Sequence, residues 1–224
     1  LRSSTDARLG FCADCRPTLQ AIRAQDVCAR CALPWCNGGA AARAGRCGRC
    51  RSWPRALSRV HATYEYGGAL ADALVRFKWL GRDDLASPLA ALLGPLLSRL
   101  AVRYDAVVPV PLHPTRLRGR GFNQSVLLAR GALRWVPRGA RPVLQLGLLQ
   151  RTRPDPPARD VDVAGRFARV RDAFALRPGV CVRGLRLLIL DDVITSGATA
   201  LACATVLTAG GAARVDALAL ARVT

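Results

Sequence analysis

Several residue types are rare or missing in this sequence, and each absence narrows the classes of protein to consider. The 224 residues contain no methionine, one glutamate (Glu65) and one lysine (Lys78), and aromatic residues make up only 5% of the chain. No run of about 18 uninterrupted apolar residues occurs, so we expect no membrane insertion. Residues 1–6 lack the apolar stretch of a secretory signal. Because position 1 is not methionine, we expect the natural chain to begin upstream of Leu1.

The charge balance is strongly positive. Thirty-four basic residues, all but one of them arginine, stand against 15 acidic residues and give a formal net charge of +19. Guanidinium groups stay protonated and suit phosphate, so this composition predicts affinity for polyanions in general. A solvated charged surface explains the same composition equally well. Half of the chain (51%) is hydrophobic, which is enough to form a sizeable core.

Seven of the nine cysteines lie within the first 50 residues. Cys28/Cys31 and Cys47/Cys50 are two Cys-x-x-Cys pairs separated by fifteen residues, a spacing typical of a structural zinc site. Four thiolates complete a tetrahedral shell and leave no open position, so we expect Zn²⁺ to hold structure and not to catalyse. The alternative is a disulfide cluster. Since disulfides are rare in the reducing cytosol and no export signal is visible, we expect zinc and a cytoplasmic protein.

The remaining cysteines are less informative. The pair Cys12/Cys15 either joins a knuckle upstream of Leu1 or recruits Cys36 into a second zinc site, and the sequence does not decide. Cys181 and Cys203 lie among apolar residues and are interpreted as small buried side chains. We therefore divide the chain into a cysteine-rich zinc-binding module (residues 1–55) and a larger domain (residues 56–224).

Residues 56–224 alternate between strand-like and helical patterns. This alternation predicts an α/β fold with a mainly parallel sheet flanked by helices. We expect strands at 60–66, 106–110, 142–149, 185–190 and 215–223, and helices at 69–80, 88–100, 122–133 and 199–209, with an Arg- and Gly-rich loop after the second strand.

The most informative stretch is Leu-Leu-Ile-Leu-Asp-Asp-Val-Ile-Thr-Ser-Gly-Ala-Thr (residues 187–199). It predicts a buried strand that delivers Asp191 and Asp192 to its carboxyl end, where open α/β sheets bind ligands. The turn that follows and the start of the next helix offer backbone N–H groups and hydroxyls to a phosphate. Carboxylates accept hydrogen bonds from sugar hydroxyls, so the combination indicates a phosphorylated ribose. Two aspartates that only cap a helix are the alternative.

These residues resemble a known family. Residues 187–199 resemble the phosphoribosyl-pyrophosphate motif of type I phosphoribosyltransferases. Val-Pro-Val-Pro-Leu-His (108–113) followed by Arg-Gly-Arg-Gly-Phe-Asn-Gln (118–124) is similar to ComF-like competence proteins, which also carry an N-terminal zinc module. The chain departs from that family's pattern at Ala158, Val161 and Arg169.

The resemblance implies a type I phosphoribosyltransferase-like fold and a role for each site residue. Asp191 and Asp192 would contact the ribose 2′- and 3′-hydroxyls, Mg²⁺ would accompany the donor, and residues 150–174 would form a lid. The 5′-phosphate would be held by Thr195, Ser196, Gly197, Ala198 and Thr199, and the loop 111–121 would face the pyrophosphate. The residues of this loop support that role, because the guanidinium groups of Arg116, Arg118 and Arg120 match phosphate oxygens. His113 is either a donor to the leaving group or a hydrogen-bonded surface residue.

Two functions remain open on the sequence. One is transfer of a phosphoribosyl group from 5-phosphoribosyl pyrophosphate to an unknown acceptor. The other is a non-catalytic accessory protein that binds nucleic acid or senses the donor, with DNA or a DNA-uptake helicase as partner. The net charge favours the second function, whereas the few aromatic residues leave little on which single-stranded bases could stack. The acceptor and the oligomeric state are not predicted.

Overall fold

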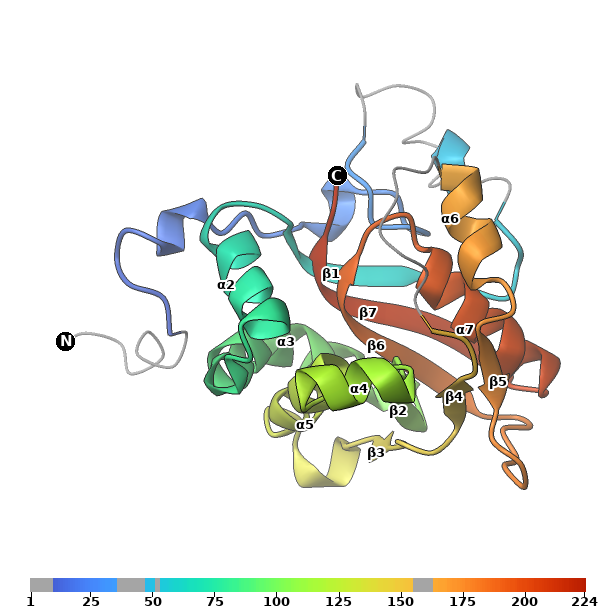
Figure 1. Ribbon diagram of the computed structural model, residues 1–224. Helices are drawn as coiled ribbons and strands as arrows, with labels where there is room; N and C mark the ends of the chain where they lie inside the picture. The colour runs from blue at the N-terminus through green and yellow to red at the C-terminus, as the bar shows by residue number, and fades with distance from the viewer. Residues whose placement is uncertain (1–9, 36–46, 51–52, 155–162) are drawn as a thin grey trace.

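A central parallel sheet organises the computed structural model, which describes residues 10–35, 47–50, 53–154 and 163–224. Its five strands run in the order β1-β7-β6-β2-β3 (Figure 1). Every pairing between neighbours is parallel. The α/β prediction with a mainly parallel sheet is therefore confirmed. The bounds are β1 (Val60–Glu65), β2 (Ala106–Pro109), β3 (Val143–Leu144), β6 (Arg186–Ile194) and β7 (Arg214–Arg222).

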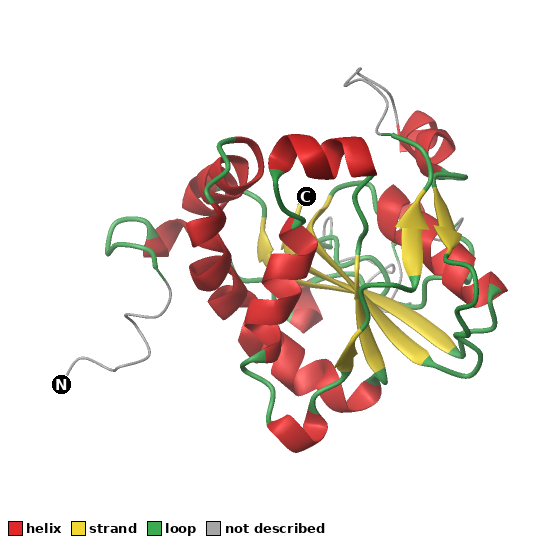
Figure 2. Ribbon diagram, turned by 60° about the horizontal axis from the view of Figure 1, so that its bottom comes forward, coloured by secondary structure: helices red, strands yellow, loops and turns green. Residues whose placement is uncertain are grey.

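Helices cover both faces of this sheet because its strands are apolar on both sides. In β6, Leu188 and Leu190 face a core formed with α2, α3 and α5, whereas Leu187 and Ile189 face a second core formed with α7. The bounds are α2 (Gly68–Trp79), α3 (Ala86–Leu100), α5 (Gln124–Leu133) and α7 (Ala198–Ala209). Figure 2 shows the strands running between these groups of helices.

The strand order places a switch point between β2 and β6. From β2 the chain passes through α5 to β3 on one side, and from β6 it passes through α7 to β7 on the other side. Connections that leave neighbouring strands in opposite directions open a crevice at their carboxyl ends, where open α/β sheets bind ligands. The topology thus selects one edge of the sheet for the site.

A small antiparallel pair stands apart from the central sheet, as Figure 2 shows. It consists of β4 (Leu149–Arg151) and β5 (Phe174–Leu176), with α6 (Val163–Val170) between them in the chain. These elements span the predicted lid. Residues 155–162 of that segment, including Ala158 and Val161, lie outside the described residues, as does the side chain of Arg169.

Three predictions of secondary structure were wrong. The loop expected after the second strand contains a helix, α4 (Pro114–Arg120), which begins with His113 as N-cap and Pro114 in its first turn and ends at Gly121 in the left-handed region. These are good start and stop signals, but they frame only seven residues. The strand expected at 142–149 is instead two short strands, β3 and β4, which belong to different sheets.

The third error concerns β6. This strand continues to Ile194, so Asp191 and Asp192 lie within it and not after it. Pairing with β7 persists past the aspartates, with Val193 opposite Ala221, and this pairing holds the chain extended. Of the two cysteines expected to be buried, Cys203 is buried but Cys181 is exposed.

The described part of residues 1–55 packs against the sheet. Backbone bonds from Ile22 to Thr63 and from Glu65 to Gln20 attach it along the outer edge of β1. Cys28, Cys31 and Cys50 are buried in the same core as α7. The division of the chain at residue 55 stays a prediction. Short 3-10 turns complete the fold at Arg16–Thr18, Ala24–Asp26, Gly48–Cys50, Asp83–Leu85, Ala101–Arg103 and Arg138–Ala140.

One helical segment, Asp83–Arg103, is long and apolar enough to cross a membrane by length and composition, with a mean hydropathy of 1.6. Half of its most apolar window is buried inside the molecule, and core helices of soluble proteins pass the same test. By length and composition alone, this segment could therefore span a membrane. The absence of membrane insertion stays a prediction.

Candidate phosphate and sugar site

A cavity of about 370 Å³ lies at the carboxyl ends of β2 and β6. Its volume falls in the range typical of small-molecule sites. Four cationic side chains and two carboxylates line it together with two threonines: Lys78, Arg116, Arg120, Arg151, Asp191, Asp192, Thr195 and Thr199. Cations outnumber carboxylates, so the cavity favours an anionic ligand. The two carboxylates can in addition accept hydrogen bonds from hydroxyl groups of that ligand.

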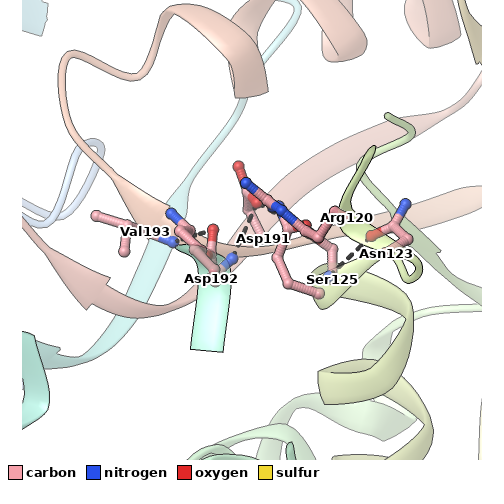
Figure 3. A network of polar contacts seen from close by, with 8 residues as sticks. Arg120, Asn123, Ser125, Asp191, Asp192 and Val193 are labelled. Atoms are coloured by element: carbon pink, nitrogen blue, oxygen red, sulfur yellow. Dashed lines mark hydrogen bonds and ion pairs between the residues drawn. The ribbon is translucent and has the colours of Figure 1, made fainter. Parts of the chain in front are cut away.

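Asp191 is held in place by its neighbours (Figure 3). Its Oδ1 accepts hydrogen bonds from Ser125 Oγ at 3.0 Å and from the Asp192 N–H at 2.9 Å. Burial, together with the charge of Asp192, raises the pKa of Asp191 to about 7, although Lys78 acts in the opposite direction. A carboxylate at this position would gain from hydrogen bonds donated by a bound ligand.

Asn123 places Ser125 at this position. Its side chain caps α5 by accepting from the N–H groups of Ser125 and Val126, and its Nδ2 donates to the carbonyl of Val110 at the end of β2. Asn123 is therefore the N-cap of α5. Through Ser125, the cap also connects α5 to Asp191.

Asp192 forms an ion pair with Lys78. The Lys78 Nζ lies 2.6 Å from Asp192 Oδ2, and only 2% of the aspartate side chain is exposed. The sequence interpretation did not single out Lys78. A signal was nevertheless available, because this residue is the single lysine among 34 basic residues. An ammonium is a compact point charge, whereas the guanidinium of arginine is larger and planar.

Residues 195–199, which we call the phosphate loop, lead from β6 into α7. Ser196 is buried and its Oγ accepts from the Ala198 N–H at 3.3 Å. Gly197 has a φ of +85°, in the left-handed region that glycine tolerates best. Thr195 and Thr199 reach the cavity. The first turn of α7 therefore points its N–H groups toward this end of the sheet, as an anion site requires.

The three arginines predicted to bind pyrophosphate, Arg116, Arg118 and Arg120, do not all lie at the cavity. Arg116 and Arg120 lie four residues apart on α4 and share one face of it. Their guanidinium carbons lie 5.1 and 5.3 Å from the ring centre of Trp79, and both residues line the cavity. Arg118 is exposed and is not among the lining residues.

His113 does not line the cavity either. It is the N-cap of α4, where its Nδ1 lies 2.7 Å from Thr115 Oγ1 and accepts from the Thr115 N–H. This position explains the histidine without a ligand.

Arg151 was missed by the sequence interpretation. It lies on β4, its side chain is buried, and its guanidinium stacks over the Phe174 ring at 5.1 Å. Its Nε donates to the carbonyl of Arg153 at 3.1 Å. Pairing of β4 with β5 brings it to the cavity, and no sequence pattern near it indicated that pairing.

Four cysteines, which we call the cysteine cluster, meet at a second site. The ligand atoms of Cys28, Cys31, Cys47 and Cys50 all lie within 4.8 Å of one another. The Sγ–Sγ distances of 3.5 Å (Cys28–Cys50), 3.4 Å (Cys31–Cys47) and 3.7 Å (Cys47–Cys50) approach the roughly 3.8 Å expected for four sulfurs at about 2.3 Å from a tetrahedral ion. The Cys47 N–H donates to Cys28 Sγ, which would stabilise this sulfur as a thiolate ligand. The cluster can hold a metal ion such as zinc.

The cysteines of this cluster and the other described cysteines are free, so within those residues the disulfide alternative has no support. Cys12 and Cys15 lie outside the cluster, and Cys36 lies outside the described residues.

Another cavity, of about 330 Å³, lies between the N-terminal segment, β1 and α3. Its lining includes Arg59, His61 and Arg99 but no carboxylate, and it lies away from the switch point. We therefore place the candidate site in the cavity at the ends of β2 and β6.

Fold and site together define a class: an α/β protein with an anion- and sugar-compatible cavity at its switch point and a four-cysteine cluster packed against the same sheet. The sequence is 32% identical to DNA utilization protein YhgH of Salmonella typhimurium over 219 residues, which cover 95% of this chain and 90% of the relative. It is 30% identical to YhgH of Escherichia coli over 220 residues, with the same coverage.

A further relative is competence protein F of Haemophilus influenzae, at 28% identity over 203 residues (84% of this chain, 86% of the relative). No family model matches the chain. At 32% identity to YhgH of Salmonella typhimurium over 95% of its length, the chain belongs to the ComF-like family.

Proposed function

We propose that this protein binds 5-phosphoribosyl pyrophosphate in the cavity at the ends of β2 and β6. The observation that carries the proposal is that two adjacent carboxylates, a phosphate loop and four cationic side chains surround one cavity. Asp191 and Asp192 would accept the ribose hydroxyls, and the phosphate loop would hold the 5′-phosphate. Arg116 and Arg120 would face the pyrophosphate, because guanidinium forks match phosphate oxygens.

The reaction that this geometry supports best is phosphoribosyl transfer to an unidentified acceptor. Mg²⁺ would enter with the donor, whose pyrophosphate and ribose oxygens are the ligands this ion prefers, and would reduce the charge of the leaving group. In this reaction the two aspartates would lie near the positive charge that develops at the anomeric carbon, and the arginines would stabilise the departing pyrophosphate. A pyrophosphate-release screen over bases and amines would identify the acceptor.

Calorimetry with the donor and Mg²⁺ tests the site. We expect the double variant Asp191→Ala/Asp192→Ala to bind the donor at least 100-fold more weakly than the unmodified chain, with its metal content unchanged. Asp105→Ala is the matched control, since Asp105 pairs with Arg186 at the opposite end of the sheet. Undiminished donor affinity in the double variant would refute the assignment.

We propose in addition a role in competence and DNA uptake, in the cytoplasm. The support is the printed names of the relatives, DNA utilization protein and competence protein F, together with the net charge of +19. DNA or a DNA-uptake helicase would be the partner. The non-catalytic alternative keeps this role and uses the cavity only to sense the donor.

A titration of single-stranded DNA at several salt concentrations tests the proposed role. Phosphate contacts by arginine predict sequence-independent binding that weakens steeply as salt rises. We expect the double aspartate variant to retain DNA binding, because the two carboxylates that it lacks repel phosphate and do not bind it. Failure of the unmodified chain to bind DNA at low salt would remove direct DNA contact from the proposal.

A further inference from the structure

Arg222 forms a first connection between the cysteine cluster and the phosphate loop. It lies at the end of β7, and its side chain is fully buried. Its Nε donates to the carbonyl of Cys31 at 2.9 Å, and its Nη1 donates to the carbonyl of Ile194 at 3.0 Å and to that of Thr195. A buried guanidinium is costly unless acceptors meet its N–H groups. One rigid group therefore holds a cysteine of the cluster and the start of the phosphate loop together.

Trp53 forms a second connection to the same loop. Its backbone N–H donates to the carbonyl of Cys50 at 3.3 Å. Arg30, itself buried, donates to the carbonyls of both Cys50 and Trp53 and so holds the tryptophan to the cluster. The indole then packs directly on Gly197, because a Cβ on that glycine would lie only 2.5 Å from Trp53 Cη2.

Both connections join the cysteine cluster to the phosphate loop. Each begins at the carbonyl of a cluster cysteine, and each ends in the phosphate loop, at Thr195 or at Gly197. Zinc binding to cysteine sites contributes folding free energy, so we expect a bound metal to fix the backbone around Cys31 and Cys50. The loop in turn needs a defined backbone if its N–H groups are to converge on an anion.

We propose that Arg222 and Trp53 are positioning residues through which the metal-bound cysteine cluster holds the phosphate loop in its anion-binding conformation. Loss of the metal then opens the loop and lowers phosphate affinity, although no cysteine touches the ligand. The identity of the ligand rests on the proposed function. The connection to the loop does not.

Hydrogen exchange in the full chain tests the connection without any ligand. We expect a zinc chelator to speed amide exchange in residues 195–199 at least tenfold, with a much smaller effect in β2. In Arg222→Met and in Trp53→Leu, we expect the loop to exchange about tenfold faster than in the unmodified chain while zinc stays bound at full stoichiometry. Tyr104→Phe is the matched control, because it removes a buried hydrogen bond to Asp216 near the opposite end of β7.

The exchange rates of the two zinc-bound variants test the proposal even if removal of zinc unfolds the whole protein. Unchanged loop exchange in both zinc-bound variants would overturn the proposal, as would equal acceleration in Tyr104→Phe. Calorimetry with 5-phosphoribosyl pyrophosphate adds a second measurement, in which Arg222→Met should bind at least tenfold more weakly. If the unmodified chain does not bind the donor, the proposed function fails, whereas the exchange result still decides whether the cluster supports the loop.

Discussion

At the scale of single residues, the only lysine of the chain balances the most buried carboxylate of the cavity. Lys78 lies 2.6 Å from Asp192 and is itself largely covered. Removing one partner of such a pair leaves an uncompensated buried charge, which costs more than the pair contributes while intact. Lys78 is therefore needed for the fold around the site as well as for the charge of the cavity.

We expect Lys78→Met to lower the free energy of unfolding by about 2–3 kcal/mol, somewhat less than for a fully buried pair because Lys78 is partly exposed. Urea unfolding measures the change. The double variant Lys78→Met/Asp192→Asn should recover most of the loss, because it removes the charge as well as its partner. A double variant no more stable than the single one would show that the lysine stabilises through packing alone.

At the scale of elements, α4 sorts three arginines that the sequence presents as equivalent. A loop would let all of them turn toward an anion, but the helix presents Arg116 and Arg120 on one face and Arg118 on another. Stacking on Trp79 holds the first two guanidiniums beside the cavity. If the donor binds as we propose, its pyrophosphate should therefore contact Arg116 and Arg120 but not Arg118.

We expect Arg116→Ala and Arg120→Ala each to weaken donor binding about tenfold, corresponding to the loss of about 1.4 kcal/mol from charge-assisted hydrogen bonds. Arg118→Ala, the matched variant, should change the affinity less than twofold. Calorimetry at one fixed salt concentration compares the three variants. An equal loss in Arg118→Ala would mean that the helix unwinds when the donor binds.

At the scale of the whole molecule, two buried groups make stability depend on pH in opposite directions. Burial lowers the pKa of His61 to about 4, so its contribution to stability is lost as the pH falls from about 6.5 to about 4. Asp191 has its pKa raised to about 7, from about 3.9 in the unfolded chain. The folded state then binds more protons than the unfolded state between these values, so this stabilising contribution is lost as the pH rises from about 4 to about 7.

We expect Asp191→Asn to be more stable than the unmodified chain by about 1–3 kcal/mol above pH 7, with the difference vanishing near pH 4. The range is set below the full shift because Asp191 is partly exposed to the cavity. Unfolding measured at a series of pH values in both proteins gives the difference directly, and the contribution of His61 cancels. A difference that does not change with pH would contradict a raised pKa at Asp191.

Features whose signal lies in residues close together in the sequence were predicted correctly. The apolar run before Asp191 predicted a buried strand, and the spacing of the four cysteines identified the residues that meet in the cluster. Elements of few residues were not predicted. The helix α4 and the short strands β3 and β4 have too few residues to show a period, and their pairing or packing partners lie far away in the sequence.

The sequence by itself determined the alternation of strands and helices, the cysteines that meet in the cluster, and the order of the two aspartates and residues 195–199 between one buried strand and the next helix, because hydrophobic periodicity and ligand spacing are local properties. Only the tertiary structure decided which cations face the aspartates and that the cluster adjoins the phosphate loop. Lys78, Arg151 and Arg222 come from three separate elements. They meet the site only through the strand order and the close packing of the folded chain, and no local pattern encodes these contacts.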